Sequence, residues 1–301
     1  MSTGTPMITF TFIRHGESTD NLRSVWAGWS DAPLSNHGMN QARALAEYFS
    51  ETHFSAVYAS DLLRARTTAE TLRDSQPAYR RLATPVSPTM SDAATSADPP
   101  PFVISPLLRE QNFGLAEGRQ WSWSPDPQLS TEEHYMRGVY PAITERSGKF
   151  PQGESLDELA QRADRVLDEL LLPEVHKAVQ SGERGIMIAV VSHGLCISEL
   201  MAAFMRRDSG SGNDMGGRYR GMMNTAWHRI SVELRDTAER QAPFLPSARL
   251  PPLIVRVTHI NQHDHLDQVK RQKAGIGSSA YDPKQRDIRA FFGGAGLPSK
   301  A

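Results

Sequence analysis

The chain has 301 residues, of which 39% are hydrophobic and 22% are charged, and its formal net charge is −1. This length favours one large α/β domain over two small ones, and the near-neutral charge excludes a global field that would attract nucleic acid or an anionic membrane. A single cysteine excludes an internal disulfide. The sequence shows neither a secretory-leader pattern nor an apolar run of the ~20 residues that cross a bilayer, so we expect a cytoplasmic protein, with a nuclear location equally compatible.

The first half of the chain alternates predicted strands and helices. Residues 7–13 are almost continuously apolar and β-branched, which predicts a strand buried on both faces. Ser35 is placed as the N-cap of a helix that runs to about residue 49, with apolar side chains on one face. Residues 54–59 predict a second strand, and a second helix is expected from residue 61 to about residue 72.

Two irregular segments interrupt this alternation. Residues 75–101 are rich in Ser, Thr, Ala and Pro and show no periodicity, which is typical of a surface insertion. Residues 102–108 predict a short strand. Residues 114–153 combine tryptophans with several prolines, and we expect them to form an irregular cap over a pocket, with one helix near residues 132–137.

The second half returns to regular elements. Ser155 and Glu158 form a capping-box pattern that predicts a helix to about residue 172. Pro173 is suited to start another helix, which would end near Gly182. The remaining predicted elements are strands at residues 185–191, 227–234 and 253–260 and a helix at residues 195–205.

This order of elements predicts a layered sheet with helices on both faces. We assign residues 1–267 to one catalytic domain that carries the two insertions. Residues 268–301 turn polar and glycine-rich, so we expect a poorly packed tail there.

Two His-Gly steps, His15-Gly16 and His193-Gly194, each follow an apolar predicted strand. In a parallel α/β sheet, the carboxyl ends of the strands meet at one crevice where ligands bind. If the two strands are neighbours, the two imidazoles face each other across that crevice. Phosphoryl transfer through a histidine is therefore our leading hypothesis.

Further candidate groups stand near other element ends. A phosphate ester needs cationic or N–H donors around its oxygens, an in-line nucleophile and a proton for the leaving oxygen. Arg14, Asn21 and Arg64 are candidate phosphate donors, and Glu110 is a candidate proton donor. The backbone N–H groups at Gly194, where the helix after His193 begins, could add anion donors. Singly, each residue also has an ordinary structural interpretation, and their ordered co-occurrence favours a site.

These ordered motifs resemble those of the histidine phosphatase superfamily, in the branch that contains phosphoglycerate mutase and fructose-2,6-bisphosphatase. The resemblance extends from residue 7 to residue 266 with gaps at the insertions, and the ordered set is far more specific than one Arg-His-Gly step. Its segments are residues 13–18 with Asn21, residues 28–35 with Gly38 and residues 41–42, residues 59–65, residues 108–110 with 113–114 and 117–118, residues 153–156, and residues 191–194.

The resemblance implies a phosphoglycerate mutase-like α/β fold, a three-layer sandwich with helices on both faces of a mixed, mostly parallel sheet. It implies that His15 is the phosphorylated nucleophile, and that Glu110 donates a proton to the leaving group and later activates water. The phosphate pocket would be formed by basic and amide groups, namely Arg14, Arg64 and His193 with Asn21 assisting. The family works without a metal ion, so we predict no metal site and no other cofactor.

The choice between mutase and phosphatase rests on finer features. Mutases of this family carry a pair of arginines that holds the substrate carboxylate. Between Gly118 and Gly153 this chain has only single arginines, at positions 119, 137 and 146. Residues 150–156 and 223–226 resemble TIGAR-type phosphatases, while residues 28–31 resemble mutases as much as phosphatases. We therefore favour hydrolysis of a small phosphorylated metabolite by a phosphoric monoester hydrolase that forms a phosphohistidine.

Two alternatives stay open. One is phosphoryl transfer of the phosphoglycerate mutase type, and the other is a non-catalytic member that binds a phosphorylated ligand or a partner. His259 and His263 would share a face only on a helix, and the segment is predicted as a strand, so we interpret them as structural. The sequence leaves the natural substrate and the oligomeric state open.

Overall fold

The computed structural model describes residues 7–76, 100–122, 125–208, 217–235 and 253–284. Their main feature is a six-stranded sheet with the strand order β3-β2-β6-β1-β7-β8. The first four of these strands are mutually parallel, and β7 runs antiparallel to both of its neighbours. The strands are β1 (Ile8–Arg14), β2 (Ala56–Ser60), β3 (Phe102–Ser105), β6 (Ile186–Ser192), β7 (Trp227–Leu234) and β8 (Leu253–Gln262). The sheet is thus mixed and mostly parallel, as predicted.

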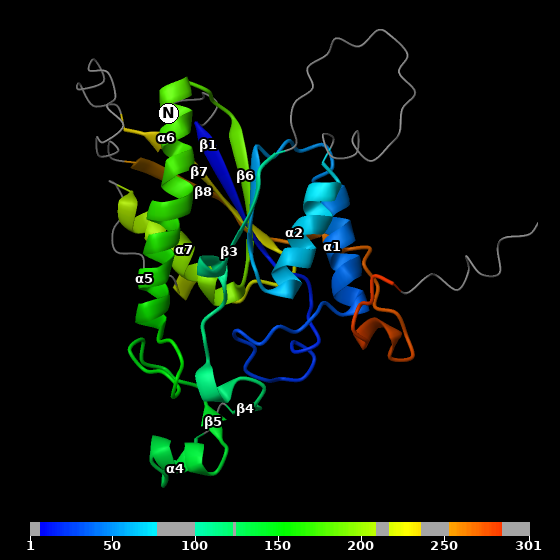
Figure 1. Ribbon diagram of the computed structural model, residues 1–301, viewed down its shortest axis with the longest axis vertical. Helices are drawn as coiled ribbons and strands as arrows, with labels where there is room; N and C mark the ends of the chain where they lie inside the picture. The colour runs from blue at the N-terminus through cyan, green and yellow to red at the C-terminus, as the bar shows by residue number, and fades with distance from the viewer. Residues whose placement is uncertain (1–6, 77–99, 123–124, 209–216, 236–252, 285–301) are drawn as a thin grey trace, which may run out of the picture.

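Helices cover both faces of this sheet (Figure 1). Helices α1 (Asn36–Tyr48) and α2 (Leu63–Asp74) lie on one face, and α5 (Leu156–Val166), α6 (Leu172–Ser181) and α7 (Gly194–Arg207) lie on the other. Side chains alternate across a strand, so each central strand contributes to both cores. On β6, Ile188 and Val190 pack in the α5–α7 core, whereas Ala189 and Val191 pack in the α1–α2 core. The three-layer α/β sandwich is therefore confirmed.

Local capping signals place the helix starts. The Ser35 side chain accepts a hydrogen bond from the backbone N–H of Gly38 and begins α1. Ser155 and Glu158 form the reciprocal capping box that begins α5. The predicted long helix does not continue evenly to residue 172, because a π-helical turn at Leu167–Leu171 separates α5 from α6. Helix α6 ends at Gly182, whose φ of 68° is a left-handed conformation that glycine adopts without strain.

The two predicted insertions differ in outcome. Most of the first, residues 77–99, lies outside the described residues. The strand expected at residues 102–108 ends at Ser105 and is followed by a 3₁₀ turn at Pro106–Leu108. The second insertion holds short strands β4 (Trp121–Ser122) and β5 (Tyr140–Pro141) and helix α4 (Thr131–Met136), and it extends away from the sheet (Figure 1).

Residues 268–284 are mostly exposed, but some of them contact the rest of the domain. The Tyr281 backbone N–H donates to the carbonyl of Leu34, and the Tyr281 ring packs beside Leu34, Met39 and Ala42. The Arg271 guanidinium donates to the buried Glu17 carboxylate, in the loop that follows β1. The polar composition of this segment did not indicate these contacts, because they are two hydrogen bonds and one aromatic ring rather than an apolar stripe. Residues 285–301 lie outside the described part of the chain.

None of the helices in the described ranges combines the length and apolarity that crossing a bilayer requires.

Candidate active site

The two predicted strand-end histidines lie side by side. Strands β1 and β6 are parallel neighbours, and their last residues, Arg14 and Ser192, are paired in register. His15 and His193 each follow one residue later, so both imidazoles emerge at the same edge of the sheet. Their ring centroids are 5.0 Å apart, and the residues are only 4% and 0% exposed. The predicted juxtaposition of the two rings is confirmed.

His15 presents an unprotonated ring nitrogen. Its Nδ1 lies 2.6 Å from the carbonyl oxygen of Gly16, and a carbonyl only accepts hydrogen bonds, so Nδ1 carries the proton and Nε2 keeps its lone pair. Burial, followed by the charges of Arg64 and Arg14, lowers the pKa of His15 well below 6.5. A neutral imidazole with a free Nε2 is the form in which histidine acts as a nucleophile.

His193 has one occupied and one unoccupied ring nitrogen. Its Nε2 lies 3.0 Å from the Ser60 hydroxyl, which itself accepts from the backbone N–H of Leu62 and can donate its own proton to Nε2. Nδ1 of His193 is buried and has no hydrogen-bond partner among the described residues. Burial and the charge of Arg64 lower the pKa of His193 well below 6.5. An unsatisfied buried nitrogen of this kind is a ready donor for a bound oxyanion.

Arg14 and Arg64 supply positive charge beside the two rings. Arg64 is 1% exposed, and its Nη1 and Nη2 each donate to a backbone carbonyl at 2.7 Å, those of Ser30 and Gly28. Arg14 donates to the carbonyl of Met222. Within the described ranges, neither guanidinium has a carboxylate at ion-pair distance, and burial lowers the pKa of both. Two cations with no carboxylate in direct contact among the described residues, beside two neutral imidazoles, form a cradle suited to an anion.

Glu110 lies next to this cradle and caps a helix. Its Oε1 accepts from the backbone N–H groups of Gln111 (3.0 Å) and Cys196 (3.1 Å), and its Oε2 accepts from that of Leu195 (3.2 Å). Two N–H groups at the start of α7, those of Leu195 and Cys196, are therefore occupied by Glu110, while the contact of the Gly194 N–H with a phosphate stays a prediction. Gly194 lies close to both Arg14 and Glu110. A Cβ atom added at this position would stand 4.0 Å from Arg14 Nε and from Glu110 Oε2.

Asn21 organises the loop after β1. Its Oδ1 accepts from the backbone N–H (3.0 Å) and the hydroxyl (3.1 Å) of Ser18. Asn224 donates from Nδ2 to Asn21 Oδ1 (3.4 Å) and to the carbonyl of His15 (3.1 Å). The structure thus places Asn21 in the loop that follows His15, while its contact with a phosphate stays a prediction.

A sequence model of the histidine phosphatase superfamily, branch 1, matches residues 10–83 and 88–239. The chain belongs to the histidine phosphatase superfamily. Among curated relatives, a probable phosphoglycerate mutase, GpmB, of Erwinia tasmaniensis is 28% identical over 88% of this chain and 100% of its own length. The fructose-2,6-bisphosphatase TIGAR B of Danio rerio is 36% identical over 88% of this chain and 99% of its own length.

A solved structure shares the fold of this histidine phosphatase superfamily member. The mycobacterial glucosyl-3-phosphoglycerate phosphatase superposes with a TM-score of 0.57 at 20% identity, over 84% of this chain and 98% of that one. A further relative, a probable phosphatase of Schizosaccharomyces pombe, is 27% identical over 94% of this chain and 79% of its own length. The relatives thus include proteins named as mutases and as phosphatases, so the chain is a phosphatase- or mutase-type superfamily member.

Arg162 is a site component that sequence reasoning missed. Its guanidinium donates to the backbone carbonyls of Leu107 (2.8 Å), Arg109 (2.6 Å) and Glu110 (2.9 Å), and it pairs with Glu154 at 2.7 Å. It therefore holds the segment that presents the Glu110 side chain. Residue 154 belongs to a family-like motif, but nothing local to the α5 sequence indicates that Arg162 reaches this loop.

Other candidate chemistry is less well supported. Burial raises the pKa of Cys196 to about 11, so this residue remains a thiol, as expected for a small core side chain. In the described ranges, no group of three or more His, Cys, Asp or Glu residues is placed to hold a metal ion. His259 lies on β8, where the predicted strand excluded a helical metal pair.

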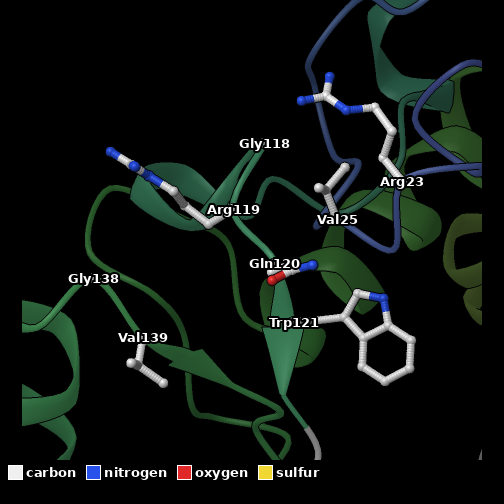
Figure 2. A pocket seen from close by; sticks show the side chains of 8 residues that line it. All are labelled: Arg23, Val25, Gly118, Arg119, Gln120, Trp121, Gly138 and Val139. Carbon is white, nitrogen blue, oxygen red and sulfur yellow. The ribbon is translucent and has the colours of Figure 1, made fainter.

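An open cavity of about 870 Å³ lies beside the second insertion (Figure 2). Its lining comes from Arg23 and Val25 on one side and from residues 118–121 and 138–139 on the other. Neither imidazole and neither cradle arginine lines it. The described cavity is therefore separate from the His15 site, and we assign the chemistry to the histidine pair because the charged and unsatisfied groups lie there.

Proposed function

We propose that this protein is a metal-independent phosphomonoesterase that hydrolyses a small phosphorylated metabolite through a phosphohistidine at His15. The observation that carries the proposal is the cradle: two buried neutral imidazoles, 5.0 Å apart, flanked by two arginines that have no ion-pair partner among the described residues. A phosphate dianion would neutralise the charges of Arg14 and Arg64. It would also accept a hydrogen bond from His193 Nδ1–H, which has no partner among the described residues.

The reaction follows in two displacements. His15 Nε2 attacks phosphorus, the bond to the ester oxygen breaks, and the protonated form of Glu110 gives its proton to that oxygen as the alcohol leaves. Glu110 then accepts a proton from water, whose oxygen attacks phosphorus and breaks the N–P bond. Inorganic phosphate leaves, and both His15 and Glu110 return to their starting states. Arg14, Arg64 and His193 stabilise the equatorial oxygens in both steps.

The positions of the arginines in the second insertion, Arg119, Arg137 and Arg146, favour hydrolysis over mutase chemistry. Arg146 donates to both carboxylate oxygens of Glu199 at 3.0 Å and also pairs with Asp157, so its charge is already neutralised. Arg119 lines the separate cavity rather than the cradle. Arg137 is exposed at the C-cap of α4. Among the described residues, these three arginines therefore do not form the pair that the resemblance associates with mutases. The relative named as a fructose-2,6-bisphosphatase also supports hydrolysis.

The proposal is tested with purified protein, a panel of phosphorylated metabolites and EDTA in every assay. We expect phosphate release from at least one ester, and brief incubation with radiolabelled ester should leave label on the protein that acid removes and alkali retains. His15→Ala should lose both the label and turnover while keeping its circular dichroism spectrum. Isomerisation of 3-phosphoglycerate without phosphate release would support the mutase alternative. Tight phosphate binding without either reaction would indicate a non-catalytic member.

A further inference from the structure

Trp29 connects the phosphate cradle to the segment that carries Glu110. The carbonyls of its two flanking residues, Gly28 and Ser30, hold the cradle guanidinium of Arg64 at 2.7 Å. The indole Nε1 of Trp29 donates at 2.8 Å to the backbone carbonyl of Glu110, the proposed proton donor. Trp29 is thus tied on one side to the phosphate cradle and on the other to the backbone of the residue whose carboxyl group would protonate the ester oxygen. We therefore expect the leaving group to lie beside this indole.

The indole is fixed yet exposed. The Trp29 backbone N–H donates at 2.7 Å to Oε1 of Glu117, and the guanidinium carbon of Arg109 lies 4.8 Å from the ring centroid. Arg109 in turn donates to both oxygens of Asp61, at 2.8 and 2.6 Å. Despite these restraints, 37% of Trp29 remains exposed. A rigid aromatic surface loses little conformational freedom when a ligand packs on it.

A neighbouring tryptophan shows what simple loop packing looks like here. Trp26 lies three residues earlier, packs against the rings of Phe113 and Phe150, and donates from its indole to the carbonyl of Tyr140. Trp29 instead leaves much of its indole ring exposed to water, while its indole N–H is bonded to the Glu110 carbonyl. An exposed indole that is held beside the proposed proton donor therefore points to a ligand.

The charges around Trp29 indicate the chemistry of that ligand. Arg109 is neutralised by Asp61, and Arg162 is neutralised by Glu154, so neither offers a free charge to a second anionic group. What remains beside Glu110 is an aromatic face that can stack on a flat or apolar group.

We propose that Trp29 is the platform for the leaving group and that the preferred substrate is a phosphomonoester whose alcohol carries a ring or an apolar face, rather than a small polyanion. This inference rests on the proposed function, because it places the ester oxygen beside Glu110. The alcohol can be aromatic or a sugar ring, since both stack on an indole, and the experiment separates these two sources.

The test compares Trp29→Ala, Trp29→Phe and Trp121→Ala, in assays of 1-naphthyl phosphate, a hexose monophosphate and glycerol phosphate. Trp121 is the matched control, because it is also 37% exposed but lines the separate cavity (Figure 2). Loss of the platform should raise KM for the ring-bearing ester that the wild type prefers by about tenfold. KM for glycerol phosphate should stay within a factor of two or so of wild type, given only a generic contact there.

Trp29→Phe separates stacking from the hydrogen bond to Glu110. It retains a ring but loses the indole N–H, so it should keep the ring preference while kcat falls by a similar factor for every ester. Trp121→Ala should leave all three esters unchanged. Equal KM changes for all esters in Trp29→Ala, or the same loss of preference in Trp29→Phe and Trp121→Ala, would overturn the proposal.

A binding readout keeps this inference independent of catalysis. Calorimetric titration of His15→Ala with 1-naphthyl phosphate, the hexose monophosphate and inorganic phosphate needs no turnover. Adding Trp29→Ala to that variant should weaken binding of the preferred ring-bearing ester while leaving inorganic phosphate unchanged. Equal weakening of binding for all three ligands would refute the role of Trp29 as a platform. If wild-type protein binds the ring-bearing ester but never hydrolyses it, only the proposed hydrolysis would be refuted.

Discussion

Replacing Arg162 by methionine is expected to destabilise the protein and to displace Glu110, although Arg162 itself does not contact the substrate in the proposed mechanism. The guanidinium donates to the carbonyls of Leu107, Arg109 and Glu110 and to the Glu154 carboxylate. The side chains of the ion pair are only 11% and 14% exposed. Methionine fills a similar volume but donates nothing, so the Glu154 charge loses its ion-pair partner and three carbonyls lose this donor, although the Glu110 carbonyl keeps the Trp29 indole.

The size of the effect follows from that burial. Removing one partner of a buried ion pair costs about 3–5 kcal/mol, because the remaining charge is left uncompensated. This is a large part of the ~5–15 kcal/mol that stabilises a typical domain. Urea unfolding followed by circular dichroism should therefore show a clearly lowered midpoint for Arg162→Met. Adding Glu154→Gln should recover part of the loss, since the neutral amide removes the unpaired charge.

Activity should report the position of Glu110 separately from stability. A displacement of about 1 Å in a catalytic group can cost roughly 10²-fold in rate. We expect that loss for alkyl esters, whose leaving oxygen needs a proton, and a smaller loss for p-nitrophenyl phosphate, whose phenolate needs little protonation. Unfolding free energy within about 1 kcal/mol of wild type, or equal losses on both substrates, would refute the positioning role of Arg162.

Four further predictions concern the cradle and its surroundings. Glu110→Gln should slow hydrolysis of alkyl phosphates far more than that of p-nitrophenyl phosphate, and equal losses would remove its role as proton donor. The lowered pKa of His15 keeps it neutral as pH falls through 6.5, so kcat/KM corrected for substrate ionisation should stay level there, and a limb at 6.5 or above would contradict this. For the same reason folding stability should fall as pH drops below 6.5, because the unfolded chain takes up protons that buried His15 and His193 do not. Arg271→Met should lower the unfolding free energy by about 1–3 kcal/mol, since the buried Glu17 loses its charged donor, and an unchanged urea midpoint would show that the C-terminal contact is dispensable.

Much of the architecture was readable from short stretches of sequence. Ser35 and the Ser155–Glu158 pair mark helix starts because a cap bonds only to N–H groups two or three residues away. The apolar runs of β1 and β6 mark buried strands, and their terminal His-Gly steps predicted two facing imidazoles. Such signals depend on near neighbours in the chain, so the sequence alone contains them.

Other features were decided only by tertiary structure. Arg162 reaches residues more than fifty positions earlier, Glu110 accepts from two N–H groups at the start of α7, and Arg271 bonds to Glu17. Each is a polar contact between segments far apart in sequence, and an arginine or glutamate in a helix or loop looks the same whether it meets solvent or a buried carbonyl. Hydrogen-bond partners of this kind are set by the packing of whole elements, because only the folded backbone brings donor and acceptor within about 3 Å.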